Sequence, residues 1–402
     1  MKVCQACASG DREILVDGGM QALCNAYQQR AINQTYQFHV LLGQCQSCGL
    51  IQLLNTPNER EIIPKYEWIT YNEPEEHLDE LSEQLLKLPG ITQDSVFCGI
   101  TYKDDSTLER LRRRGIKTTW RVSPRDLNIT LSNAGSETVL PKLNDESTIK
   151  KLIDKNQKPD VIIGRHVLEH AFDTQKFLNA MSILVKPQGY VVVEVPDCTK
   201  NLKEYDYTMI WEEHILYFTP TSFAKLFQNT FFTLFQRFYY PYTDENVMIA
   251  VVKNNRSDND VKKSQLFSNE EDFLGLMFSK NFDVIYKKIH VYFRELFNQN
   301  KKLAIFGAGH ISCMFINLFE IKNYISFVVD DDPHKNDLYM PGSLLPIVHS
   351  QKLYEAEIDI CFMGLSSAAE KKVMSKHSIF LDKKGRFLSL RKLVPFIMGE
   401  MV

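Results

Sequence analysis

The sequence predicts an α/β protein in which a small cysteine-bearing module precedes two Rossmann-type domains. Three observations support this fold class. Two Cys-x-x-Cys pairs lie near the N-terminus, β-rich runs alternate with helical stretches through the middle, and a strand, glycine turn and helix recur in the last third. The chain has 402 residues, which is too many for one ordinary core, because domains usually run to roughly 100–200 residues.

The cysteines of the first module, residues 1–75, have the spacing of metal ligands. Cys4 and Cys7 form one pair, and Cys45 and Cys48 form the other. Each tight turn directs two thiolates at one ion, and two pairs complete the tetrahedral set that zinc prefers. We expect a structural zinc ion, because a closed four-thiolate shell leaves no open position for catalysis. A redox role is the alternative, but redox Cys-x-x-Cys motifs normally occur once and open a helix.

The middle of the chain, residues 76–255, alternates short β-rich runs with helical stretches. Such runs begin at Ser95, Asp160 and Gly189. Strands that alternate with helices indicate a parallel sheet with crossover helices. We therefore expect one Rossmann-type domain in this region.

The last third, residues 256–402, repeats the α/β pattern behind a polar linker predicted from Lys253 to Val261. One long helix or a broken pair is expected over residues 270–300. The run Lys302-Leu-Ala-Ile-Phe-Gly-Ala-Gly-His then predicts a strand that leads into a glycine turn. A second Rossmann-type domain follows from this order of elements.

The glycine turn of the last third is similar to a dinucleotide-binding loop. Gly307 and Gly309 lie in the turn, and His310 stands at the start of the helix. Asp330 ends the next strand about 20 residues later, where a ribose-binding carboxylate stands in dinucleotide folds. NAD in this loop is therefore an alternative cofactor, although the third glycine of the motif is replaced by Ser312.

Composition narrows the classes of partner. A net charge of −3 gives no electrostatic case for nucleic acid. No run approaches the roughly 18 apolar residues of a membrane span, and the N-terminus lacks the apolar run of a signal peptide. We expect a cytoplasmic protein whose partner is a small molecule, with no nucleic acid and no membrane, and the sequence leaves the oligomeric state open.

Three stretches together resemble the sugar C-methyltransferases, and the resemblance covers nearly the whole chain. They are Cys45-Gln-Ser-Cys-Gly-Leu-Ile-Gln-Leu, then Val167-Leu-Glu-His with the later Val185-Lys-Pro-Gln-Gly, and Trp211-Glu-Glu-His-Ile-Leu-Tyr-Phe. The resemblance implies a zinc-binding domain, a central S-adenosylmethionine methyltransferase domain and a C-terminal Rossmann-like domain on the substrate side. It also implies methyl transfer to carbon of a nucleotide-linked deoxy-ketosugar.

The resemblance assigns acid–base chemistry to the third stretch. In that chemistry a base removes a proton next to the sugar ketone, and the enediolate attacks the methyl group of the sulfonium. Carried over by position, His214 is the candidate base and Glu213 its partner, since a carboxylate can raise the basicity of a histidine. The plain alternative is a helix start with a solvated Glu-Glu pair.

The resemblance also implies binding residues on both sides of the reaction. For the substrate these are Trp211, Tyr217, Gly307, Gly309, His310 and Asp330. For the cofactor they are Tyr66, in the stretch Tyr66-Glu-Trp-Ile-Thr-Tyr, together with Gly99, His166 and Glu169.

The first nucleotide-binding loop departs from the family's Glu-x-Gly-x-x-x-Gly pattern. Gly99 alone remains of it, and Ser123 stands where a carboxylate usually ends the second strand, between Arg121 and Arg125. One interpretation is that a loop aspartate, Asp104 or Asp105, supplies the ribose contact beside Ser123.

The other interpretations give the pocket a different role. The arginines would favour a phosphorylated ligand in it. An NAD- or nucleotide-dependent sugar-modifying enzyme and a non-catalytic binding protein with a decayed pocket both stay open.

Overall fold

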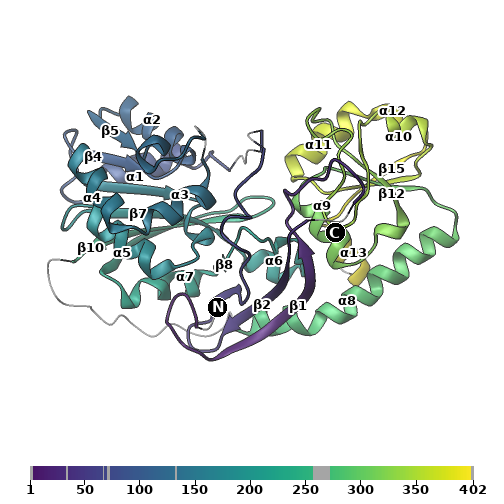
Figure 1. Ribbon diagram of the computed structural model, residues 1–402, viewed down its shortest axis with the longest axis horizontal. Helices are drawn as coiled ribbons and strands as arrows, with labels where there is room; N and C mark the ends of the chain where they lie inside the picture. The colour runs from purple at the N-terminus through teal and green to yellow at the C-terminus, as the bar shows by residue number, and fades with distance from the viewer. Residues whose placement is uncertain are drawn as a thin grey trace.

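The chain folds around three β-sheets, one in each predicted part (Figure 1). The structure is a computed structural model that describes residues 3–32, 35–66, 68–69, 73–131, 134–256 and 272–399. The predicted fold class, a small N-terminal module followed by two Rossmann-type α/β domains, is confirmed. Most of the predicted linker and the start of the predicted long helix lie outside the described residues.

The first sheet is antiparallel and has the order β1-β2-β3-β8. Its strands are β1 (Arg12–Ala22), β2 (Gln37–Cys45), β3 (Ile51–Leu53) and β8 (Leu216–Tyr217). The last strand comes from the predicted acid–base segment of the middle domain, and Tyr217 pairs with Ile51 of β3. The N-terminal module therefore holds that segment by backbone hydrogen bonds.

The second sheet has the order β5-β4-β6-β7-β10-β9, in which the last two strands are antiparallel to their neighbours. Its central parallel strands are buried, as is typical of a sheet covered by helices on both faces, whereas the edge strand β5 is half-buried. The chain moves outward from β4 to β5 and then returns to place β6 on the other side of β4. A switch of this kind opens a crevice at the carboxyl ends of the strands, where ligands bind in α/β folds. The strands are β4 (Val96–Gly99), β5 (Thr118–Arg121), β6 (Val161–Arg165), β7 (Tyr190–Asp197), β9 (Phe232–Tyr240) and β10 (Asn246–Asn254).

Helices and short helical turns connect and cover the second sheet. Helix α3 starts directly after Gly135, and Glu137 lies in the first turn of this helix. The helices are α1 (Leu78–Leu86), α2 (Asp105–Arg113), α3 (Ser136–Leu143), α4 (Glu146–Lys155), α5 (Thr174–Leu184), α6 (Thr199–Lys203) and α7 (Pro220–Leu226).

The third sheet is parallel throughout and has the order β13-β12-β11-β14-β15. It repeats the switch of direction at β11, which has β12 on one side and β14 on the other. The elements are α8 (Asp272–Asn298), β11 (Leu303–Phe306), α9 (His310–Leu318), β12 (Ile325–Val329), β13 (Ile347–Val348), α10 (Lys352–Glu355), β14 (Ile360–Met363), α11 (Ser367–Lys376), α12 (Ser378–Asp382), β15 (Arg386–Ser389) and α13 (Leu393–Met398).

The long helix α8 lies along the N-terminal strands and reaches the C-terminal domain (Figure 1). Gly275 of α8 packs so closely on the module that an added Cβ would lie 2.3 Å from Gln44 Oε1. Tyr207 of the middle domain donates a hydrogen bond to the carbonyl of Phe278 (2.7 Å). One hydrophobic core runs through all three parts, so they pack as one body. In the described part of the chain, no helix combines the length and apolar character needed to cross a bilayer.

Tyr27 fastens the N-terminal module to the C-terminal domain. Its hydroxyl donates a hydrogen bond to the carbonyl oxygen of Ala308 (2.5 Å), inside the glycine turn. The ring is buried and packs against Trp68, with the ring centroids 5.7 Å apart. Removal of the hydroxyl would leave the buried carbonyl without this donor.

We predict that Tyr27→Phe lowers the free energy of unfolding by about 1–3 kcal/mol, the usual cost of an unsatisfied buried acceptor. Denaturant unfolding followed by fluorescence measures it. Tyr36→Phe is the matched control, because the Tyr36 hydroxyl also forms a hydrogen bond to the backbone, in which it accepts the N–H of Asn58, but at an exposed position. Equal losses in the two variants would contradict the assigned role of Tyr27.

Candidate functional site

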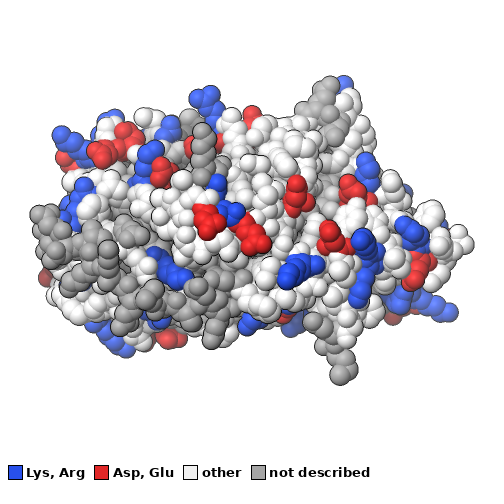
Figure 2. Space-filling model, turned by 90° about the horizontal axis from the view of Figure 1, so that it is seen from below, with Lys and Arg blue, Asp and Glu red and all other residues white. Residues whose placement is uncertain are grey.

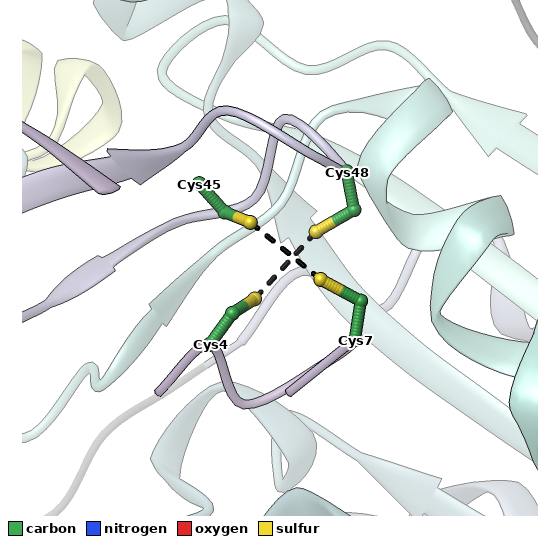
Figure 3. Close-up of side chains that lie close together, drawn as sticks. All are labelled: Cys4, Cys7, Cys45 and Cys48. Carbon is green, nitrogen blue, oxygen red and sulfur yellow. Dashed lines mark hydrogen bonds between the residues drawn. The ribbon is translucent and has the colours of Figure 1, made fainter. Parts of the chain in front are cut away.

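The four paired cysteines converge at the base of the N-terminal module (Figure 3). The Sγ atoms of Cys4 and Cys48 lie 3.6 Å apart, and those of Cys7 and Cys45 lie 3.5 Å apart. All four sulfur atoms lie within 4.8 Å of one another. A tetrahedral zinc–thiolate site with bonds of about 2.3 Å needs sulfur atoms somewhat under 4 Å apart, so these side chains fit zinc. The fifth cysteine of the module, Cys24, is fully buried elsewhere, beside Cys313.

A small cavity of about 140 Å³ lies at the carboxyl ends of β4 and β6, at the switch point of the second sheet. The turn after β4, the turn after β6, the start of α3 and the acid–base segment each contribute to its wall. The lining residues include Tyr66, Tyr102, Lys103, Ser136, Glu137, His170 and Glu213. Tyr66, a predicted cofactor residue, therefore does lie at a cavity, stacked on Trp68 at 5.0 Å.

The charges around the small cavity favour a cation. Glu137 and Glu213 are 6% and 1% exposed. Burial raises the pKa of both carboxyl groups, and for Glu213 the nearby Glu137 and Glu212 raise it further. The Lys103 ammonium does not offset them fully, because it is paired with Glu73 at 2.5 Å. A bound cation would stabilise both carboxylates.

Asp104 closes the turn after β4 from inside. One carboxylate oxygen accepts the backbone N–H groups of Ile100 (2.7 Å) and Thr101 (2.9 Å), and the other accepts that of Arg165 (2.9 Å). Burial raises its pKa to about 6 despite these bonds. Gly99 is needed for this closure, since an added Cβ would lie 2.8 Å from Asp104 Cβ. A ribose contact from Asp104 stays a prediction, and both of its oxygens already accept backbone N–H groups, one oxygen from its own turn and the other from Arg165.

Asp105 and Ser123, the two other candidates for the ribose contact, also interact with neighbouring residues of the protein. Asp105 lies at the surface in an ion pair with Arg121 at 2.9 Å, which uses the arginine that the phosphate alternative required. Ser123 precedes the helical turn Pro124–Leu127, and its carbonyl accepts the N–H of Asp126 (2.9 Å). A ribose contact from Asp105 or from Ser123 stays a prediction.

A buried charge network lies beneath the crevice, where β6 and β7 end. Glu194 is fully buried and contacts Arg165 Nε (3.0 Å), His77 Nε2 (3.2 Å) and His166 Nε2 (3.1 Å). Arg165 also donates to the carbonyls of Lys103 (2.7 Å) and Pro74 (2.9 Å). Arg165 therefore connects the turn after β4 and the segment before α1 to the sheet.

His166, predicted to bind the cofactor, is instead surrounded by carboxylates. Its Nδ1 atom lies 3.3 Å from Glu169 and 3.7 Å from Glu73. Although burial opposes the charge, Glu73 and the carboxylates of Glu169 and Glu194 raise its pKa to about 10. Its φ of 50° is in the left-handed region, which non-glycine residues rarely adopt. His166 lines the large cavity, whereas Glu169 is fully buried beneath it.

A larger cavity of about 780 Å³ separates the middle and C-terminal domains. The middle domain contributes His166, Trp211, His214 and Glu245. The C-terminal domain contributes His310 and a polar group formed by Ser366, Ser367, Lys371, Lys372 and Arg391. A cavity of mixed charge therefore lies between the middle domain and the domain that the resemblance places on the substrate side.

Three aromatic rings line the large cavity where the domains meet. His310, the first residue of α9, stacks on Trp211 at 4.8 Å, and Trp211 contacts His214 at 4.8 Å. Burial lowers the pKa of His214 to about 3 and that of His310 to about 4. The expected increase in basicity from Glu213 is not observed, because burial and the nearby His310 and Lys103 outweigh the carboxylates.

The predicted acid–base pair borders different cavities. His214 lines the large cavity, whereas Glu213 lines the small one and accepts a hydrogen bond from Asn25 Nδ2 (2.6 Å). Tyr217, predicted to bind substrate, is buried and exchanges hydrogen bonds with the backbone N and O of Trp211 (2.9 and 3.1 Å). Tyr217 therefore positions Trp211 rather than facing the cavity.

The C-terminal glycine turn is closed in the manner of the first loop. Asp330 accepts the N–H of Ala308 (2.8 Å) and pairs with Lys335 (3.1 Å), while Tyr27 binds the Ala308 carbonyl. Gly307 has φ +100°, and an added Cβ would lie 2.6 Å from Leu365, whereas a Cβ at Gly309 would meet no atom within 4 Å. The NAD alternative is therefore not favoured, because the ribose-type carboxylate and the turn amide bind each other.

Several residues of the site escaped sequence reasoning. Glu137 and Lys103 border the small cavity, and Glu194 carries the buried network. A glycine directly before a helix that begins Ser-Glu is the signal that could have indicated Glu137. Nothing in the local sequence of Lys103 or Glu194 indicates burial beside other charges.

Two regions of the chain match methyltransferase families. Residues 96–236 match a family described as a methyltransferase domain, and residues 253–390 match one described as a C-methyltransferase C-terminal domain. The chain thus carries one region similar to a methyltransferase domain and one similar to a C-methyltransferase C-terminal domain.

The matches to characterised proteins cover only part of each chain. The C-methyltransferase NovU of Streptomyces niveus is 23% identical over 187 residues, which cover 46% of this chain and 44% of NovU. A ubiquinone biosynthesis O-methyltransferase of Brucella ovis is 34% identical over 74 residues, which cover 18% of this chain and 29% of that enzyme. The chain thus spans less than half the length of these relatives.

Two solved structures resemble part of the chain. The N-methyltransferase NodS of Bradyrhizobium japonicum, in complex with S-adenosylhomocysteine, matches with a TM-score of 0.28 and 14% identity over 44% of this chain and 86% of NodS. The 1,6-didemethyltoxoflavin N1-methyltransferase of Burkholderia thailandensis matches with a TM-score of 0.31 and 12% identity over 45% of this chain and 79% of that enzyme.

We predict that the purified protein holds one zinc ion per chain, since a four-thiolate site takes a single ion. Cys45→Ser should reduce the zinc content strongly, as measured by elemental analysis, while Cys24→Ala should retain it. Equal zinc loss in both variants, or full zinc retention in Cys45→Ser, would contradict the assigned ligand set.

We also predict a pH-dependent contribution of His166 to stability. The folded pKa of about 10 lies above the ordinary value of 6.5, so this contribution is fully present below pH 6.5 and is lost as the pH rises through 10. Unfolding of wild type and His166→Asn, compared from pH 6 to pH 10, measures it, because asparagine tolerates a positive φ. A difference between the two proteins that does not shrink with rising pH would contradict the protonated state.

Proposed function

We propose that the protein transfers a methyl group from S-adenosylmethionine to carbon of a nucleotide-linked deoxy-ketosugar. The single observation that carries the proposal is the pair of cavities at the edge of the second sheet. The smaller has two buried carboxyl groups, and the larger reaches the C-terminal domain past His214. The matches to a methyltransferase domain and to a C-methyltransferase C-terminal domain support the same arrangement.

The small cavity suits the cofactor. It lies at the switch point, where α/β folds bind ligands, and its carboxyl groups complement a positive charge. Tyr66, Tyr102, Glu137 and Glu213 would hold the cofactor there. When bound, S-adenosylmethionine supplies an electrophilic methyl group.

The large cavity suits a substrate with an anionic part and a reactive carbonyl. Lys371, Lys372 and Arg391 line the side contributed by the C-terminal domain, and these cations are suited to a diphosphate. The rings of His214 and His310 line the same cavity, so a sugar attached to that diphosphate would extend toward them.

His214 acts as the proton acceptor in this proposal. Burial keeps its imidazole neutral in the free protein, which is the form that accepts a proton, although the same burial makes it a weaker base than a solvated imidazole. Trp211 fixes the position of the ring, and Tyr217 fixes Trp211 through two backbone hydrogen bonds. His214 and Glu213 lie at the boundary between the two cavities, as a methyl transfer from one to the other requires.

The zinc centre has a structural part in the proposal. Cys45 ends β2, and β3 follows it and pairs with β8 of the acid–base segment. A zinc ion bound by four thiolates would fix this edge of the module and, through it, the segment that carries His214.

We predict that wild-type protein transfers a labelled methyl group from S-adenosylmethionine to a thymidine-diphosphate 4-keto-6-deoxyhexose, and that His214→Asn lowers kcat by about 10²- to 10⁴-fold. Mass spectrometry of the sugar measures transfer. Solvent deuterium uptake next to the ketone, without cofactor, isolates proton removal. His349→Asn, an exposed ring, is the control.

The outcomes separate the parts of this proposal. Deuterium uptake that persists in His214→Asn would remove the base assignment. Cofactor binding without transfer to any nucleotide ketosugar would remove the substrate class. The absence of cofactor binding in calorimetric titration would remove the methyltransferase activity itself.

A further inference from the structure

We propose that Glu137 recognises the positive charge of the cofactor. It would replace the acidic residues that the family pattern has in β4 and at the end of β5 and that this chain lacks there. This inference rests on the proposed function, since it concerns how the small cavity holds S-adenosylmethionine. The strand ends themselves carry no free carboxylate. Phe97 stands in β4, Asp104 serves the turn, and Ser123 follows β5.

The position of Glu137 is built by its own helix start. Gly135 precedes α3 with an extended backbone, and an added Cβ there would lie 2.5 and 2.6 Å from the two carboxylate oxygens of Glu137. The side chain therefore folds back over the glycine and faces the small cavity, of which both residues are lining residues. Ser136 anchors this turn to the loop after β6, because its hydroxyl donates to the carbonyl of His166 (2.8 Å).

The Glu137 carboxylate has little compensation within the protein. Its hydrogen bonds come from its own backbone N–H and from Thr138 Oγ1, the latter at 3.4 Å. Lys103 is near enough to stabilise the charge, but its ammonium is bound to Glu73. A carboxyl group that is 6% exposed and so weakly paired is stabilised when a cation enters the cavity beside it.

The cofactor offers two positive groups that Glu137 could face, the sulfonium and the ammonium of the amino-acid end. S-adenosylhomocysteine keeps the ammonium and lacks the sulfonium charge. Comparison of the two ligands therefore identifies the group, and binding measured by calorimetry gives a readout that does not depend on turnover.

The experiment titrates zinc-loaded wild type, Glu137→Gln and Gly135→Ala with S-adenosylmethionine and with S-adenosylhomocysteine. We expect Glu137→Gln to raise the Kd for S-adenosylmethionine by about 10- to 100-fold, as for loss of a charge-assisted contact. Gly135→Ala should act in the same direction, because its Cβ displaces the carboxylate without removing the charge. Glu245→Gln is the matched control, since Glu245 lines the large cavity and burial raises its pKa to about 7.

Each outcome has one meaning. Loss of affinity for S-adenosylmethionine alone assigns Glu137 to the sulfonium, and equal loss for both ligands assigns it to the ammonium. Wild-type affinity in Glu137→Gln, or an equal loss in Glu245→Gln, overturns the inference while the proposed function stands. If wild type binds neither ligand, the proposed function fails and this inference fails with it.

Discussion

The site depends on one buried interaction, the contact of Arg165 with Glu194. Both side chains are almost completely buried, and the carbonyl groups of Lys103 and Pro74 each accept a hydrogen bond from one terminal nitrogen of the guanidinium. Loss of one partner would leave the other charge buried, which typically costs about 3–5 kcal/mol. Through these contacts the ends of β6 and β7, the turn after β4 and the segment before α1 keep fixed positions. The turns after β4 and β6 contribute to the walls of both cavities, and the segment before α1 contributes to the wall of the large one.

The loop chemistry follows from this constraint. Asp104 accepts two N–H groups of its own turn and the backbone N–H of Arg165, so the turn after β4 is fastened to the buried pair. A glycine-rich turn would leave those N–H groups available to a ligand. Here the side chains that face the small cavity from its other walls include Tyr66, Glu137 and Glu213, to which we assign the proposed recognition. On the face shown in Figure 2, basic and acidic side chains are intermixed. The carboxyl groups of Glu137, Glu212 and Glu213, in contrast, are buried and close enough to raise the pKa of Glu213.

Contacts among all three parts of the chain support the large cavity. β8 inserts the acid–base segment into the N-terminal sheet, and Tyr27 joins that module to the C-terminal glycine turn. His310 of the C-terminal domain then packs on Trp211 of the middle domain. Because these contacts link all three parts, a structural change in the zinc module would alter the position of His214, although Cys45 is far from His214 in sequence.

The sequence by itself determined the fold class, because strand–helix alternation and glycine turns are local patterns. It also determined the cysteine set, since Cys-x-x-Cys spacing directs two thiolates at one ion whatever surrounds them. It brought His214, Trp211 and His310 forward as candidates, and the structure places all three at one cavity. Only the tertiary structure decided that Asp104 binds its own turn, that Asp330 binds the glycine turn at Ala308, that Tyr217 holds Trp211, and that Glu137 faces the small cavity. Those outcomes depend on which donor lies nearest to each carboxylate once distant segments are packed together, and no local pattern specifies that neighbour.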